Sequence, residues 1–278
     1  MARSIANYLL AVLVLTAKHL LLLIGISAVL AWLMQIVNLR LLKNVIRLIG
    51  NRAYIWTIGW IGIPLHELGH AMFCIIFGHR IDSITLLDTK AKSGHYGNVR
   101  HSYNKKNPWH LLGNLFIGMA PIITGSALIW LLSILLLDVR FHYISWVDVH
   151  ATLTGQLLAL PKVLFLSIQN GLAILAGIFR GFSWKSLLFL YISFAIGTNI
   201  NMSKMDLQHI PKVLIGIVIL ILCFNLATAW IGDFSLQALA WVENLFSIGY
   251  GVLIFVLSLC FFFLLLTFIL NKLFHKAP

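Results

Sequence analysis

Long apolar runs alternate with short polar stretches along the whole chain. An apolar run of about 18 or more residues is long enough to cross a bilayer as a helix. One run, residues 161–179, also contains Gln169, Asn170 and two glycines, so the pattern leaves open whether it crosses the membrane or re-enters it. The six clearer runs predict transmembrane helices near residues 20–37, 54–77, 109–137, 184–197, 213–230 and 246–270.

The N-terminal region carries a longer apolar run than one crossing needs. Residues 7–35 are apolar apart from Lys18 and His19. We therefore expect an interfacial turn in this region before the first transmembrane helix. Basic residues then recur at helical spacing among Leu and Ile over residues 39–49, which predicts a separate amphipathic helix in the membrane interface.

The longest polar stretch, residues 78–107, directly follows the second predicted helix. Residues 92–97 at its centre are rich in turn-forming types. The flanking segments 81–87 and 99–103 have strand character, so we expect them to pair as a β-hairpin.

Composition supports a membrane setting for the whole chain. Its residues are 60% hydrophobic and only 10% charged, whereas about 25% are charged in a soluble domain. The fold class predicted is an all-α polytopic membrane protein, with six or seven transmembrane helices and a small β-hairpin after the second. The net charge of +12 comes from basic residues at the ends of apolar runs. The positive-inside rule and anionic headgroups explain this distribution, so we predict a lipid bilayer and no nucleic acid as partner.

The second predicted helix carries the sequence His66-Glu67-Leu68-Gly69-His70. Two histidines four residues apart lie on one face of a helix, where their imidazoles can share a zinc ion. Glu67 lies beside them and can act as the base that takes a proton from a zinc-bound water. Ionisable side chains inside a membrane are energetically costly and usually mark function. We therefore expect one Zn²⁺ per chain, held by His66 and His70, with Glu67 as the catalytic residue.

A third zinc ligand must come from elsewhere in the chain. Asp206 ends a polar patch that directly follows an apolar helix, and an Asp oxygen completes a set of two histidine nitrogens well. His209, three residues further on, is the alternative ligand. Glu243 is the remaining glutamate of the chain, at the mouth of the last predicted helix. Asn114 is polar within a predicted span and either lines the active-site cavity or joins two helices by a hydrogen bond.

These features resemble the site-2 protease family of intramembrane zinc metalloproteases. The shared features are the His-Glu-x-x-His motif in a transmembrane helix, a hairpin-like loop after it and an Asp at the start of a later helix. The chain looks more narrowly like a bacterial branch of membrane zincins. The elements in common with that branch are Gly78-His79, Gly97-Asn98-Val99, Asn104 to Pro108, Gly113-Asn114, Ala120-Pro121-Ile122 and Ser203 to Asp206.

The resemblance implies hydrolysis of peptide bonds in membrane-spanning or membrane-bound substrates, with Asp206 as the third ligand. It also implies a substrate-binding asparagine, for which Asn199 and Asn201 are the candidates. The family pattern Asn-x-x-Pro-x-x-x-x-Asp-Gly is not kept, because Leu207 follows Asp206 and no proline separates Asn199 from Asp206. The bacterial cytoplasmic membrane is the location expected, and the sequence does not indicate an oligomeric state.

The chain divides into three regions on this interpretation. Residues 1–52 form an N-terminal anchor and interfacial helix, residues 53–210 the metalloprotease core, and residues 211–278 the C-terminal transmembrane helices. Two other functions remain open from the sequence. One is a catalytically inactive, zinc-binding membrane scaffold, and the other is a transporter component.

Overall fold

The computed structural model of the chain describes residues 2–90, 96–143, 153–200, 210–228 and 233–274. It is mostly helical, with one small antiparallel sheet. Within these residues, four helical segments are long and apolar enough to cross a membrane: residues 5–49, 108–137, 161–180 and 241–274. The predicted all-helical fold with a small hairpin is thereby confirmed, and four of its helical segments are of membrane-spanning length. Two further apolar helices, Trp184–Gly197 and Ile215–Thr228, are shorter.

The N-terminal region is one continuous helical rod. Helix α1 (Ala2–Leu20) continues through a π-helical segment, η1 (Leu21–Ile26), into α2 (Ser27–Ile49). The expected interfacial turn and the separate amphipathic helix were therefore wrong. Lys18 and His19, the polar residues that suggested a turn, are both buried. Lys18 pairs with Glu243 at 2.5 Å, and Asn225 bonds His19 Nδ1 at 3.1 Å.

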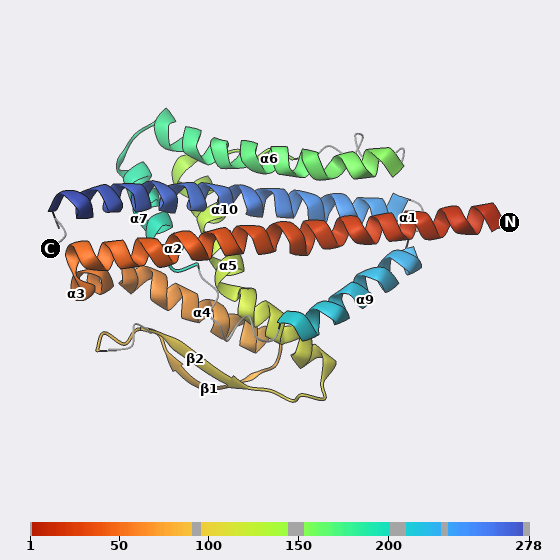
Figure 1. Ribbon diagram of the computed structural model, residues 1–278, viewed down its shortest axis with the longest axis horizontal. Coiled ribbons are helices and arrows are strands. Elements are labelled where there is room, and N and C mark those ends of the chain that lie inside the picture. The colour runs from red at the N-terminus through yellow and green to blue at the C-terminus, as the bar shows by residue number, and fades with distance from the viewer. Residues whose placement is uncertain (1, 91–95, 144–152, 201–209, 229–232, 275–278) are drawn as a thin grey trace.

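Two long helices lie along this rod. Helix α10 (Asp233–Phe274) packs against α2 on one side and against α6 (Leu153–Arg180) on another, so that the three run lengthwise together (Figure 1). The segment whose crossing was left open, 161–179, thus belongs to a helix of spanning length. Helix α9 (Ile210–Thr228) packs against α1.

The part of the fold that positions the motif begins at Gly50, where α2 ends. A short helix, α3 (Asn51–Tyr54), and a π-helical segment, η2 (Ile55–Gly59), lead into α4 (Trp60–Ile76), which carries the motif. Helix α4 packs against α5 (Pro108–Leu137) and α7 (Trp184–Gly197). Helix α5 begins at Pro108, and the side chain of Asn107 caps it by accepting a bond from Trp109 N at 2.9 Å.

A hairpin follows α4 at a sharp turn. Gly78 ends the helix with φ 71°, while His79 N bonds Cys74 O and Gly78 N bonds Ile75 O, which is the Schellman arrangement that favours glycine. Strands β1 (Arg80–Thr85) and β2 (Asn98–Ser102) then pair antiparallel, with an irregularity between Ile81 and Ser83. The predicted hairpin is confirmed, and it lies against α4 (Figure 1).

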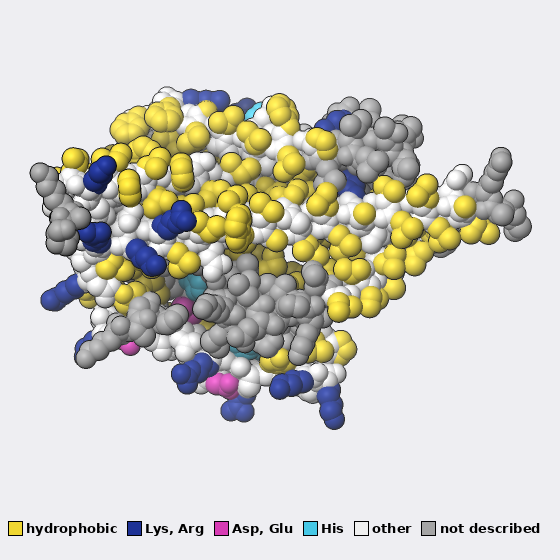
Figure 2. Space-filling view, in the orientation of Figure 1, with side chains coloured by type: hydrophobic (Ala, Val, Ile, Leu, Met, Phe, Trp, Pro, Cys, Tyr) yellow, Lys and Arg dark blue, Asp and Glu magenta, His cyan; other side chains and the backbone are white. Residues whose placement is uncertain are grey.

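Surface side chains separate by type along the molecule. Lys and Arg side chains gather near the end of α2 and over the hairpin, whereas hydrophobic side chains cover much of the long helices (Figure 2). This separation is what lipid contact along the helices and polar contact at their ends require.

Candidate metal centre

The two motif histidines project from the same face of α4. His66 is half-buried and His70 is 8% exposed. Their ring nitrogens Nε2 lie 3.2 Å apart. The predicted convergence of the two imidazoles is therefore present, and each ring is fixed by a second contact through its other nitrogen.

Backbone carbonyls from two other helical segments hold these rings. His66 Nδ1 lies 2.7 Å from the carbonyl oxygen of Asn199, just after α7. His70 Nδ1 lies 2.7 Å from the carbonyl oxygen of Ile117 on α5. A carbonyl oxygen only accepts hydrogen bonds, so in both rings Nδ1 must carry the proton. In a neutral imidazole this leaves the lone pair on Nε2, which is the form that binds metals.

The distance between the two Nε2 atoms fits a shared metal ion. Two lone pairs facing each other at 3.2 Å repel unless a cation or a proton lies between them. Zinc–nitrogen bonds of about 2.0–2.1 Å in a tetrahedral arrangement place two ligand nitrogens about 3.3 Å apart. The chemistry of this donor pair therefore suits zinc.

A glycine brings α7 close enough to supply the carbonyl that holds His66. Gly62 lies one turn before His66, and a Cβ placed on it would be 2.1 Å from Ala195 O and 2.2 Å from Asn199 Nδ2. Any larger residue would push the end of α7 away from α4. Its neighbours in the fold lie more than 130 residues away in the sequence, so the local sequence around Gly62 does not predict this contact.

Glu67 faces the hairpin. It is 7% exposed, and the backbone of Gly97, just before β2, lies against it. A Cβ on Gly97 would be 2.7 Å from Glu67 Oε1. Glu67 follows His66 directly in α4, and its side chain contacts the segment just before β2. Gly97 belongs to the Gly97-Asn98-Val99 element of the family resemblance, but its contact with Glu67 depends on how the hairpin folds back onto α4.

The other predicted site residues have mixed outcomes. Asn199 lies at the centre, but its side-chain amide donates to Ala195 O at 2.9 Å and to Thr198 Oγ1 at 3.1 Å. A role for it in substrate binding stays a prediction. Asn114 is buried on α5 and is not among the residues that line the cavity beside His66. Asn201 lies outside the described residues.

Both candidates for a third ligand, Asp206 and His209, fall in residues 201–209, outside the described part of the chain. Among the residues that the structure describes, no group of three or more His, Cys, Asp or Glu side chains is arranged to hold a metal. Glu243, the one glutamate of the sequence after the motif, is paired with Lys18. The described donors are therefore the two histidines, and the end of α7 that holds His66 leads directly into residues 201–209.

Comparisons of this chain with protein-family models, with curated proteins and with solved structures found no match.

Proposed function

We propose that this chain is an intramembrane zinc metalloprotease of the kind that the site-2 proteases represent. The observation that carries the proposal is the pair of Nε2 atoms 3.2 Å apart, with both Nδ1 protons committed to backbone carbonyls. Two acceptor nitrogens that face each other cannot form a hydrogen bond with each other. A divalent cation between them accepts both lone pairs at once.

In this proposal each nearby residue has one task. His66 and His70 hold the zinc ion, and Asp206 is the third ligand. The carbonyls of Asn199 and Ile117 fix the orientation of the two rings. When bound, zinc lowers the pKa of a coordinated water to about 7 and polarises a carbonyl group.

Glu67 is the proton carrier. Its carboxylate takes the proton from the attacking water and returns it to the amine that leaves when the peptide bond breaks. Burial between α4 and the hairpin keeps bulk water away from this carboxylate. The two roles need a carboxylate, so an amide at the same position would keep the shape and remove the proton transfer.

The proposed setting is a membrane with the catalytic helix inside it. Together with α4, α7 and α9, the four long apolar segments would give the six or seven crossings. Substrates would be membrane-spanning or membrane-bound proteins or peptides, and the compartment the bacterial cytoplasmic membrane. An inactive zinc-binding scaffold with the same ligands is the main competitor.

Metal content and a charge-neutral variant test the proposal together. We expect about one zinc per purified chain in the unmodified protein and in Glu67→Gln, as measured by elemental mass spectrometry. His70→Ala should lose the metal, while His142→Ala, which changes an exposed histidine, should keep it.

Proteolysis is measured by comparing the membrane proteins of cells that express each variant. Full-length single-span proteins should accumulate with Glu67→Gln, and their shortened forms should appear with the unmodified protein and with Asp82→Asn, a control at an exposed carboxylate. Zinc binding with identical membrane proteomes for Glu67→Gln and the unmodified protein would favour the scaffold. Absence of zinc from the unmodified protein would refute the metal centre, since a shared proton between the histidines would then explain their contact.

A further inference from the structure

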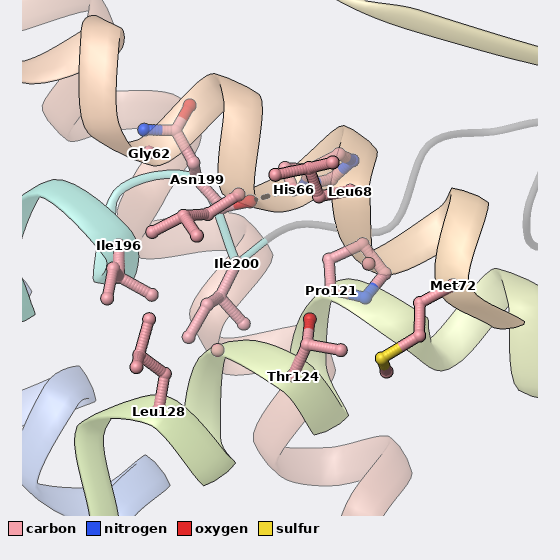
Figure 3. A pocket seen from close by; sticks show the side chains of 13 residues that line it. Gly62, His66, Leu68, Met72, Pro121, Thr124, Leu128, Ile196, Asn199 and Ile200 are labelled. Atoms are coloured by element: carbon pink, nitrogen blue, oxygen red, sulfur yellow. Dashed lines mark hydrogen bonds between the residues drawn. The ribbon is translucent and has the colours of Figure 1, made fainter. Parts of the chain in front are cut away.

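A cavity of about 190 Å³ lies directly beside His66. Its walls come from α4, α5 and the end of α7, and its side chains surround a common space (Figure 3). His66 belongs both to this wall and to the proposed metal centre. The cavity is therefore continuous with the place where a peptide bond would be held.

The walls of the cavity are almost wholly apolar. Aliphatic side chains dominate them, among which are Leu65, Leu68, Met72, Leu128, Ile196 and Ile200. Apart from His66, the polar side chains of the wall are already bonded to the protein. Thr124 Oγ1 donates to Ala120 O at 2.8 Å, and the Asn199 amide donates to Ala195 O. A polar or charged occupant would lose its water and find few partners, whereas an apolar one would lose nothing.

Glycines set the floor of the cavity by letting the helices touch. A Cβ on Gly69 would be 2.6 Å from Thr124 Oγ1, and one on Gly125 would be 2.9 Å from Ile200 Cδ1. The three helical segments therefore meet tightly below the cavity. Its volume of about 190 Å³ is enough for one side chain and too small for a whole helix.

The cavity rim reaches the apolar outside of the molecule. Leu68 and Met72 line it and are 48% and 44% exposed. Ile75 and Ile76 continue an exposed apolar surface along α4. The opposite side of the motif is covered, since Gly97 lies against Glu67. A segment that lies in the bilayer can thus reach the metal centre past Leu68 and Met72.

We propose that this cavity binds one large aliphatic or aromatic side chain of the substrate, next to the bond that is cut. The inference rests on the proposed metalloprotease function and adds a specificity to it. The volume suits the occupant, since a cavity of about 150 Å³ with similar walls accepts a benzene molecule. Leu, Met and Phe fit these requirements, while Gly leaves the cavity empty and Asp brings a charge into it.

Amino-acid hydroxamates test the cavity without any need for a known substrate. A hydroxamate group ligates zinc through two oxygens, so its side chain lies beside the metal. The probes are the N-acetyl hydroxamates of Gly, Leu, Phe and Asp, and the measurement is calorimetric titration of the zinc-loaded protein in detergent. Burial of the larger side chains should make Leu and Phe probes bind about 10- to 100-fold more tightly than the Gly probe.

Two variants fill the cavity from different walls. Leu128→Phe enlarges a side chain on α5, and Met72→Phe enlarges one at the rim on α4. Either should reduce the preference for Leu over Gly to within about threefold, while zinc content and Gly-probe affinity stay unchanged. Leu131→Phe is the matched control, because Leu131 is an exposed α5 residue outside the cavity wall, and it should retain the preference.

The outcomes separate the two proposals. Equal binding of the Gly and Leu probes by zinc-loaded protein would overturn the cavity proposal and leave the metal centre intact. So would a preference that survives in both filling variants. A phospholipid that native mass spectrometry finds on the unmodified protein but not on Leu128→Phe, without any side-chain preference, would make the cavity a lipid site and overturn the proposal. Absence of zinc would overturn both.

Discussion

The backbone of Gly97 lies against the side chain of Glu67, so closely that a Cβ on Gly97 would be 2.6 Å from Glu67 Cγ. The neighbouring Tyr96 is buried, and its hydroxyl donates to Asn51 Oδ1. Asp88 N donates to Tyr96 O at 2.5 Å. The segment just before β2 is thus held in place by Asn51 and Asp88, and it packs directly against the side chain of Glu67.

Substitution Gly97→Ala should displace Glu67 while leaving the histidines in place. A misplacement of about 1 Å can reduce catalysis on the order of 100-fold, so we expect a large loss of proteolysis. Zinc content should not change, because no carbonyl that holds His66 or His70 comes from the hairpin. The measurement is the amount of shortened membrane protein relative to the unmodified chain, together with metal analysis.

The matched control for this change is Gly181→Ala. No atom lies within 4 Å of a Cβ placed on Gly181, and it does not have positive φ. It should keep full activity. If Gly97→Ala kept it as well, the contact with Glu67 would have no catalytic importance.

Lys18 on α1 and Glu243 on α10 should contribute to the stability of the fold only as an ion pair. Both side chains are essentially buried, and apart from each other neither Lys18 Nζ nor the Glu243 oxygens has a hydrogen-bond partner among the described residues. Removal of one partner leaves the other charge buried and unpaired, at a cost of about 3–5 kcal/mol. Lys18→Met and Glu243→Leu should each lower the free energy of unfolding in detergent, and the double variant should recover most of the loss.

An exposed ion pair provides the comparison for the coupling energy that these single and double variants measure. Arg80 Nε and Asp82 Oδ1 lie 4.0 Å apart on the hairpin with both side chains largely in solvent. The coupling in such a pair is about 0–1 kcal/mol. A coupling for Lys18 and Glu243 as small as this would show that their burial does not make them interdependent.

Stability should decrease below neutral pH because of His79. Burial lowers the pKa of His79, and its hydrogen bond to the His110 carbonyl at 2.9 Å opposes this only in part. Its ring also contacts His101, His110 and Tyr103. The unfolded chain has the ordinary pKa of about 6.5 and so binds more protons between that pH and the lower folded pKa. The contribution of neutral, buried His79 to the free energy of unfolding is fully present above about pH 6.5. It is lost as the pH falls toward the pKa that His79 has in the folded chain.

Thermal unfolding in detergent measures this effect at about pH 8 and about pH 5.5, on either side of the ordinary histidine pKa. His79→Gln can keep a donor near the His110 carbonyl and has no proton to gain, so its stability should depend less on pH. His142→Gln, at an exposed histidine, should have the slope of the unmodified chain. Equal slopes for all three proteins would contradict the assignment to His79.

The sequence predicted the hairpin and the face shared by His66 and His70, because both depend on local periodicity. It did not predict what holds the imidazoles, since the acceptors are backbone carbonyls of Ile117 and Asn199 on other helical segments. A backbone group has no signature in the sequence, and its position depends on how α5 and α7 pack.

The mistaken turn near Lys18 has a related cause. A lysine and a histidine inside an apolar run indicate a break when only their neighbours are considered. In the fold their partners are Glu243 and Asn225, each more than 200 residues away, and these contacts allow the helix to continue. Local polarity predicted a boundary where long-range pairing removes the need for one.

The third zinc ligand is predicted to be Asp206 and not His209. Asn199 closes one side of the centre through its carbonyl, so the chain leaves α7 within reach of the two imidazoles and enters residues 201–209. Asp206→Ala should lower the zinc content of the purified protein strongly, because two imidazoles alone bind zinc weakly compared with three ligands. Asp206→His should restore part of it, since imidazole is also a good ligand. His209→Ala should retain about one zinc per chain, because a catalytic zinc site needs only three protein ligands and leaves its fourth position to water. Loss of zinc from His209→Ala with retention in Asp206→Ala would reverse the assignment.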